Sequence, residues 1–189
     1  MAKNIDKDLE QAILEMPQKE KDKILLRLID KNVILVEQLH YRLLEDEDYD
    51  LQVRKDKAIE AIVYFSKLGN LKYPKFILKH LRSANGSITH FKKITSNKIG
   101  EIELYLVLLN SFFENHSFIT NYPLYHPDVN LIRLYLCNKL SALLKLIDKV
   151  HEDYKIEFAP ALNMLLAQMQ KGEFRSYAKE FKFPEDFSL

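Results

Sequence analysis

Apolar residues recur at intervals of three and four positions along almost the whole of this 189-residue chain. That spacing places side chains on one face of an α-helix, whereas strands alternate every second residue. Clear alternation of the strand type is nearly absent, and only four Gly and six Pro are present to make the tight turns of a hairpin-rich protein. The pattern therefore predicts an all-α fold.

The predicted helices number seven to nine and fall mostly into pairs. Two apolar stripes with a short connection, in residues 18–31 and 33–45, predict an antiparallel helix pair. Asp50 is the expected N-cap of the next helix, which ends before Gly69. A compact multi-helix bundle and a short α-solenoid of antiparallel helix pairs both fit, as a single domain over residues 1–189.

The middle of the chain is expected to contain one short helix and one central helix. Tyr73-Pro74 opens the short helix, which we expect to end near Arg82 because residues 83–87, SANGS, are typical of a break. Residues 88–96 fit either a helical turn or an extended link. Asn97 is the expected N-cap of a helix whose centre, Ile99–Phe113, is apolar on nearly every side, so we expect it to be the most buried.

Two further helices are predicted in the last third of the chain. Asp128 is the expected N-cap of a long helix over residues 129–154. Pro160 is expected to open the last helix and Gly172 to follow its end, before a tail rich in Phe and Tyr.

One segment resembles a known repeat family. Residues 50–62, DLQVRKDKAIEAI, resemble the Asp…Val-Arg…Ala helix of HEAT-type repeats, although Ala58 stands one position later than that pattern prefers. The resemblance implies a solenoid of stacked helix pairs. It covers about a dozen residues, and the chain contains no second copy at a fixed period.

The charges are distributed unevenly along the chain. Residues 61–100 hold seven Lys, one Arg and no acid, although the whole chain has 27 acids and a net charge of +1. Within this stretch the spacing of Lys72, Lys75, Lys79 and Arg82 places them within about 80° of arc on one helix face. The sequence therefore predicts a basic helical surface, and the candidate binding residues are Lys72, Lys75, Lys79, Arg82, Lys92 and Lys93.

This basic stretch supports two binding hypotheses and one structural alternative. The first is a non-enzymatic binding or scaffold module that meets an acidic protein partner. The second is sequence-independent nucleic-acid binding by the same surface, with Tyr73, Phe76 and Phe91 available for stacking. The structural alternative is an ordinary solvated face, or one that the acidic residues 45–50 neutralise within the fold.

Catalytic motifs are not evident, and the sequence favours a protein that is not an enzyme while leaving the question open. It lacks a glycine-rich phosphate loop, and its single cysteine, Cys137, lies in an apolar run where we expect it to be buried. Glu37 and His40, and likewise Asp148 and His151, are spaced one helical turn apart, as in a helix-borne di-metal enzyme. That is the third hypothesis, and we expect no catalytic residue, metal or cofactor.

The hydropathy and the cysteine content of the sequence also indicate where in the cell the protein is expected. No window approaches the roughly twenty apolar residues that span a bilayer, and the N-terminus lacks an apolar signal core. Together with the single cysteine, these features favour a cytoplasmic protein without a membrane partner. The partner's identity and the oligomeric state are left open.

Overall fold

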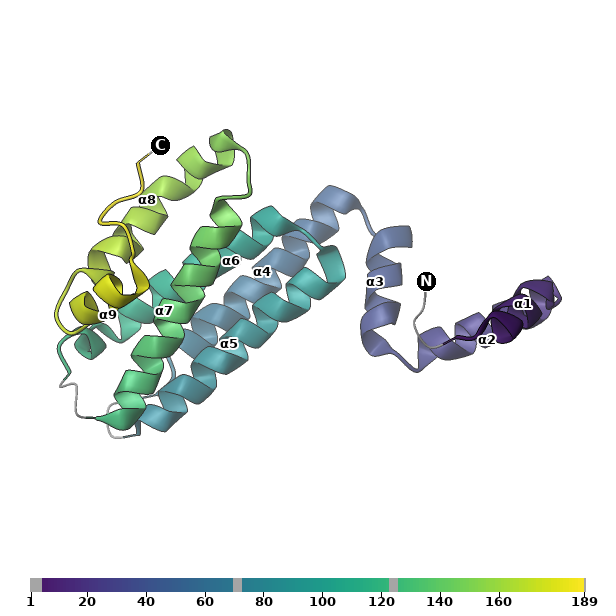
Figure 1. Cartoon of the computed structure of the whole chain (residues 1–189), viewed down its shortest axis with the longest axis horizontal. Helices are drawn as coiled ribbons and strands as arrows, with labels where there is room; N and C mark the ends of the chain where they lie inside the picture. Colours follow the sequence, from purple (N-terminus) through teal and green to yellow (C-terminus); the bar gives the residue numbers. More distant parts are fainter. Residues whose placement is uncertain (1–4, 70–72, 123–125, 189) are drawn as a thin grey trace. The chain divides into compact units, whose positions relative to one another are not determined.

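A computed structural model describes residues 5–69, 73–122 and 126–188 of the chain. In these residues it has nine α-helices, one short 3-10 helix and no strand (Figure 1). The all-α prediction is therefore confirmed. The chain divides into two units, Met1–Glu47 and Asp48–Leu189. The single domain expected over residues 1–189 stays a prediction.

The first unit contains three short helices, α1 (Lys7–Glu15), α2 (Gln18–Asp30) and α3 (Val33–Leu43). Side-chain caps start two of them. The Asp6 carboxylate accepts a hydrogen bond from Leu9 N at 2.8 Å, and Asn32 Oδ1 accepts one from Leu35 N at 3.1 Å. The helices predicted at residues 18–31 and 33–45 are both present.

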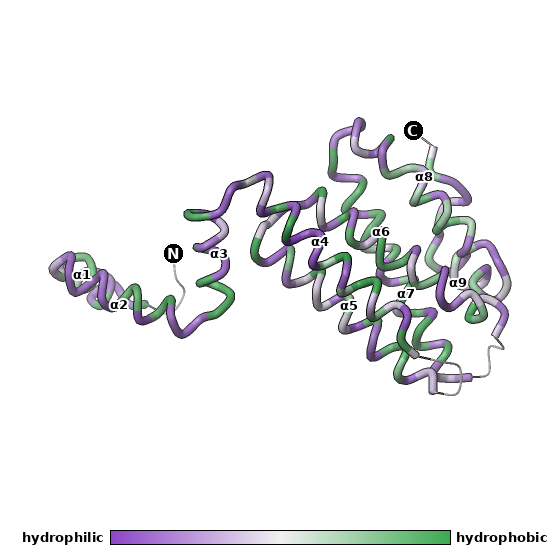
Figure 2. The backbone as a smooth tube through the Cα atoms, turned by 180° about the vertical axis from the view of Figure 1, so that it is seen from behind, coloured by the Kyte–Doolittle hydropathy of each residue, from purple (hydrophilic) through white to green (hydrophobic). Residues whose placement is uncertain are grey.

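The apolar stripes of these three helices do not form a core. None of the three has a buried residue among those described, and Figure 2 shows green segments repeating along them. Exposed side chains include Leu25, Leu28, Val36 and Leu43. A segment of about 45 residues buries too little surface to form a substantial core alone. The periodicity thus predicted the helices but not their burial.

The second unit opens with a long helix, α4 (Glu47–Ser66). Asp50 lies inside its first turn, so the prediction that Asp50 is the N-cap is wrong by about one turn. Acidic side chains are stabilised throughout the first turn of a helix by the macrodipole, which makes the starting residue hard to read from an acidic run. Lys55 of α4 pairs with Glu103 of α6 (Lys98–Asn115) at 2.9 Å and fixes α4 against that helix.

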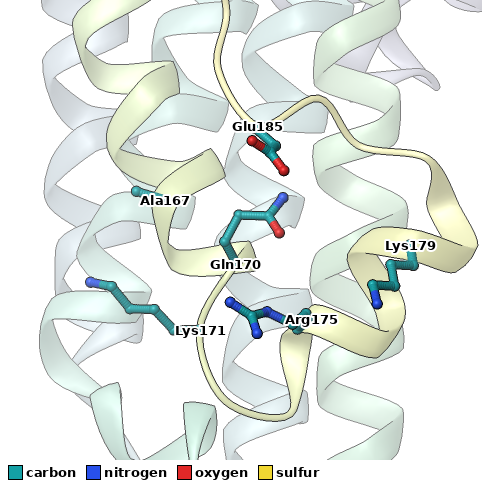
Figure 3. Close-up of a pocket in the computed structure, with 6 residues that line it drawn as sticks. All are labelled: Ala167, Gln170, Lys171, Arg175, Lys179 and Glu185. Carbon is teal, nitrogen blue, oxygen red and sulfur yellow. The ribbon is translucent and has the colours of Figure 1, made fainter.

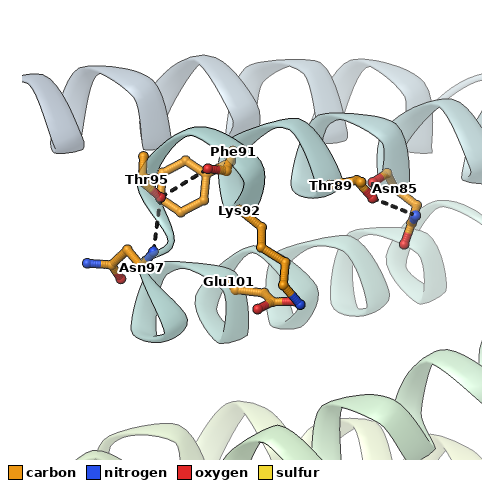
Figure 4. Close-up of polar contacts among 7 residues, drawn as sticks. All are labelled: Asn85, Thr89, Phe91, Lys92, Thr95, Asn97 and Glu101. Carbon is orange, nitrogen blue, oxygen red and sulfur yellow. Dashed lines mark hydrogen bonds and ion pairs between the residues drawn. The ribbon is translucent and has the colours of Figure 1, made fainter. Parts of the chain in front are cut away.

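Helix α5 (Pro74–Thr95) runs without interruption through residues 83–87, where we had predicted a break. Its polar side chains bond to carbonyls of their own helix. Ser83 Oγ donates to Lys79 O at 3.2 Å, and Thr89 Oγ1 donates to Asn85 O at 3.0 Å. Figure 4 shows Asn85 and Thr89 one turn apart and hydrogen-bonded to each other. The apolar stripe continues beyond the expected break with the buried residues Ala84, Ile88, Phe91 and Ile94.

The turn from α5 to α6 is short. Ser96 adopts a left-handed conformation with φ of 53°, and Asn97 then caps α6 as predicted, its Oδ1 accepting from Gly100 N at 2.7 Å. A Cβ at Gly100 would lie 2.7 Å from the Phe91 ring. This close approach requires glycine and holds the start of α6 against the end of α5.

Helix α6 is the centre of the second unit. It contacts α5, α7 (Pro127–Ile147) and α8 (Glu152–Met169). Its residues Leu104, Leu108 and Phe112 are fully buried. The prediction of a central helix over Ile99–Phe113 is confirmed for the residues that the structure describes.

Two predicted helix starts near the C-terminus are wrong. Helix α7 begins at Pro127 with His126 as its N-cap, so Asp128 lies in the first turn. Helix α8 begins at Glu152 with His151 as its N-cap, and Pro160 lies inside it. A proline inside a helix removes one backbone hydrogen bond and disfavours the helix. Here Phe158 and Leu162, on either side of Pro160, are buried, and their packing keeps α8 helical.

The C-terminal segment packs back onto the second unit. After the 3-10 helix η1 (Ser117–Thr120), α7 and α8, the chain forms α9 (Phe174–Phe181), which contacts α7 and α8. Phe174 is fully buried, and the tail that follows contributes the buried Phe183. Among the described residues, no helix combines the length and apolar character needed to cross a membrane.

Arg133 is a buried cation that the sequence analysis did not single out. It lies on α7 without solvent exposure. Its Nε and Nη2 donate to Ile119 O at 3.2 and 2.7 Å, Nη2 also donates to Tyr122 O, and Nη1 donates to Asn130 Oδ1 at 3.1 Å. These bonds satisfy the guanidinium and tie η1 to α7. The only sequence signal was one Arg inside the apolar run LIRLYL.

Candidate functional site

Helix α5 carries five of the six predicted binding residues and, over its 22 residues, no acid. We call Lys75, Lys79, Arg82, Lys92 and Lys93 the α5 candidate surface. Lys72 lies outside the described residues. Because α5 is continuous, Lys75 and Lys93 belong to one rigid element and are about 27 Å apart along its axis.

Burial fixes which way this helix faces. Ile77, Leu81 and Ile88 point into the core, so the opposite face is exposed. At 100° per residue, Lys75, Lys79, Arg82 and Lys93 fall within about 60° of arc on that exposed face, whereas Lys92 lies on the flank. All five side chains are exposed.

The cations of the α5 candidate surface have different partners. Lys92 Nζ lies 2.8 Å from Glu101 Oε1, and the Glu101 side chain, on α6, is only 4% exposed (Figure 4). Lys92 thus neutralises a buried carboxylate and serves the fold. The side chains of Lys75, Lys79 and Arg82 form no ion pair or hydrogen bond with any residue that the structure describes.

A further cation, Lys139 on α7, lies in the neighbourhood of Arg82. Its Nζ is 5.6 Å from the centroid of the Tyr105 ring and 5.4 Å from that of Tyr135. Burial lowers the pKa of Lys139 and raises the pKa of Tyr135 to about 12, and the positive charge of Arg82 partly opposes the rise at Tyr135. Nothing in the sequence indicated a role for Lys139, because this residue lies in an apolar helix outside the acid-free stretch.

The three aromatic residues proposed for stacking differ in accessibility. Tyr73 and Phe76, at the start of α5, are 51% and 52% exposed, and their rings meet edge to face at 6.1 Å. Phe91 is buried against Gly100. The expectation that Phe91 is available for stacking is therefore wrong.

The carboxylate and imidazole pairs of the metal hypothesis lie in different units. Glu37 and His40 belong to α3, and His40 Nδ1 is 2.9 Å from Glu45. His151 follows α7, with its Nδ1 3.2 Å from Asp153 Oδ2. Within the described ranges, no three His, Cys, Asp or Glu side chains lie together in a way that could hold a metal ion.

No protein-family model, curated protein or solved structure matches the chain. The HEAT-like residues 50–62 form part of α4, and no match identifies them as a repeat. Functional inference therefore depends on the geometry of α5 and its neighbours.

Proposed function

We propose that this protein is a non-enzymatic binding or scaffold module that meets an acidic segment of a protein partner with the α5 candidate surface. The observation that carries the proposal is the row of Lys75, Lys79 and Arg82, which are exposed on one face of an acid-free helix and lack a counter-ion among the described residues. The lone, buried Cys137 supports a reducing, cytoplasmic location as part of the same proposal.

An acidic partner suits this geometry because Lys75, Lys79 and Arg82 are exposed within about 60° of arc on one helix face. Buried side chains set the register of α5 and thus fix where the three charged side chains leave the helix. Ordering each of these side chains on binding still costs about 0.5–1.5 kcal/mol. Exposed charges add mainly to the rate and specificity of association, and so we expect weak, salt-sensitive binding. The neutralisation of this surface by residues 45–50 remains the competing hypothesis.

The test uses the full chain and a fluorescein-labelled peptide of alternating Glu and Ser, read by fluorescence anisotropy at low salt. We expect saturable binding by the wild-type chain and at least a tenfold loss in the Lys75→Gln Lys79→Gln Arg82→Gln variant. Thermal stability should change little, because exposed charges shift it by under about 0.5 kcal/mol.

The matched control replaces three exposed lysines outside α5, in Lys57→Gln Lys145→Gln Lys149→Gln. It removes the same charge and should retain most of the binding. If the two variants lose affinity for the peptide equally, net charge alone accounts for the binding. If the wild-type chain does not bind the peptide and the α5 variant is destabilised, the result would instead support neutralisation of the surface within the fold.

Nucleic acid is the second candidate, and the exposed pair of Tyr73 and Phe76 beside Lys75 favours it. Aromatic faces next to cations stack single-stranded bases without reading their sequence. A labelled oligothymidine tests it. Binding should weaken in Phe76→Ala, and log affinity should fall with log salt by about 0.7 for each phosphate contacted. Binding of the oligonucleotide in preference to the acidic peptide would reverse the order of the two candidates.

A further inference from the structure

A pocket of about 650 Å³ lies between the end of α8, helix α9 and the C-terminal tail, apart from α5. It is lined by Ala167, Gln170, Lys171, Arg175, Lys179 and Glu185 (Figure 3). Five of the six lining residues are exposed and Gln170 is half-buried, so the pocket is an open hollow at the surface. Three cations and one carboxylate among the six residues give the lining a formal charge of +2.

The cationic side of the pocket is positioned by the core. Phe174 and Ala178 are buried and fix the register of α9. Arg175 and Lys179 each follow one of these residues by one position, so they are carried together, one turn apart, on the next face of the helix. Figure 3 shows them along the same edge of the pocket.

The turn before α9 is also held in place. Gly172 has a φ of +48°, and a Cβ there would collide with the carbonyl of Thr120. Glu173 N donates to the same carbonyl at 2.9 Å. Lys171 therefore projects from a turn that is fixed at the following two residues, with its Nζ 3.4 Å from Gln168 Oε1.

The opposite side of the pocket is held by the C-terminal tail. Phe183 is buried, and its N donates to Ala178 O at 2.9 Å. Phe187 is clamped by Asn163, which accepts from Phe187 N at 2.7 Å and donates to Phe187 O at 3.3 Å. Glu185 lies midway between these two anchors and faces Gln170 across the pocket (Figure 3).

The charged groups of this pocket do not neutralise one another. The side chains of Arg175, Lys179 and Glu185 form no ion pair or hydrogen bond in the described part of the chain, although they line one surface hollow. A ligand between them can therefore place an anionic group against the two cations and a hydrogen-bond donor against the carboxylate. Arginine favours phosphate and carboxylate oxygens because its planar fork matches their geometry.

We propose that this pocket binds a small phosphomonoester that also carries a hydroxyl group. The phosphate lies against Arg175 and Lys179, with Lys171 adding to the positive field. The hydroxyl donates to Glu185. A phosphomonoester suits the pocket better than a monocarboxylate because its charge, about −1.5 to −2 near pH 7, matches the +2 lining.

The experiment titrates the ¹⁵N-labelled full chain with glycerol 3-phosphate and, separately, with inorganic phosphate, at constant ionic strength. We expect saturable shifts confined to amides of residues 167–187 with both probes, and tighter binding of glycerol 3-phosphate. Arg175→Gln Lys179→Gln should weaken both probes at least tenfold, whereas Lys145→Gln Lys149→Gln, an exposed pair with the same spacing on and just after α7, should bind as the wild type does.

Glu185→Gln tests the hydroxyl contact by comparing the two probes. Removing its charge relieves the repulsion of either phosphate, so inorganic phosphate should bind more tightly. Glycerol 3-phosphate also loses the stronger acceptor for its hydroxyl, so its advantage over inorganic phosphate should shrink. Unchanged spectra with both probes would overturn the proposal. The proposal would also be overturned if amide shifts spread over all basic surfaces, or if the two double variants lost affinity for the probes equally.

Discussion

Lys92 on α5 and Glu101 on α6 form an ion pair across the turn between the two helices, with Nζ 2.8 Å from Oε1. Glu101 is the first acid after a stretch of forty residues that contains none. Its side chain is nearly inaccessible, while that of Lys92 is half-exposed. Glu101, on the neighbouring helix, thus supplies a negative charge next to the end of the acid-free stretch.

Removing Lys92 should destabilise the protein more than removing an unpaired lysine of the same helix. Lys92→Met keeps most of the aliphatic stem but leaves the carboxylate of Glu101 buried without its partner, which should cost about 1–3 kcal/mol. Urea denaturation measures the change. Lys79→Met is the control and should cost under about 0.5 kcal/mol. If the double variant Lys92→Met Glu101→Gln is no more stable than Lys92→Met alone, the ion pair is not the cause.

The central position of α6 predicts a large effect at Leu106. Its side chain is buried, so Leu106→Ala should lower the free energy of unfolding by about 2–5 kcal/mol through lost burial and the cavity left behind. Leu131→Ala, at an exposed site on α7, should change it by under about 0.5 kcal/mol. Similar small effects at both positions in urea denaturation would show that α6 is not the centre of the core.

His116 predicts a loss of stability in mild acid. The ring is buried, with Phe112 and Phe118 at centroid distances of 4.9 and 5.6 Å. Burial lowers the pKa of His116, and a backbone group of Ser66 partly opposes that effect. The unfolded chain therefore takes up the proton more readily than the folded one. Stability from the neutral imidazole is complete above the ordinary pKa of about 6.5 and declines as the pH falls below it.

Urea midpoints at about pH 7.5 and about pH 5.5 measure this dependence. His116→Phe should lose part of the difference between the two midpoints, because its side chain does not titrate. An unchanged difference in His116→Phe would show that His116 does not contribute to acid sensitivity.

Cys137 should be unreactive while the protein is folded. The residue is fully buried on α7, and burial, followed by the charge of Glu180, raises the pKa of its thiol to about 12. Little thiolate is present at neutral pH, and the reagent has no access. We expect no colour with Ellman's reagent until guanidinium unfolds the chain. Asn138→Cys, one residue later and exposed, should react at once; rapid reaction of the wild-type chain would contradict the burial of Cys137.

The features that local chemistry determines were predictable from the sequence. Asn97 was recognisable as an N-cap because its side chain bonds to Gly100, three residues away. The burial of α6 followed from a helix that is apolar on nearly every side. Both depend on residues that are close in the chain.

The errors in the fold arose where tertiary packing overrides local preference. Residues 83–87 resemble a break, but the buried Ala84 and Ile88 keep α5 helical, and Ser83 bonds to its own helix. Pro160 resembles a helix start, but it lies in the middle of α8 because Phe158 and Leu162 pack on either side of it. Propensity is a weak guide when a neighbouring helix supplies the contacts.

The candidate surface was only partly visible in the sequence. The absence of acids pointed to the basic residues of α5, but it gave no indication that Lys92 has Glu101 as a structural partner. Nor could it reveal Lys139, whose position beside Tyr105 and Tyr135 depends on how α6 and α7 pack. The pocket at α9 was missed because its residues come from three segments joined only by the fold.

The buried guanidinium of Arg133 also affects which parts of the protein open together. The segment around η1 is bonded to α7 through Ile119 O and Tyr122 O, and to the start of α9 through Thr120 O and Glu173 N. If this segment opened locally, the buried charge of Arg133 would lose its hydrogen-bond partners. Opening of η1 alone therefore has a high free-energy cost. Amide hydrogens of η1 should therefore exchange with the slow, cooperative kinetics of α7 rather than with those of a surface loop.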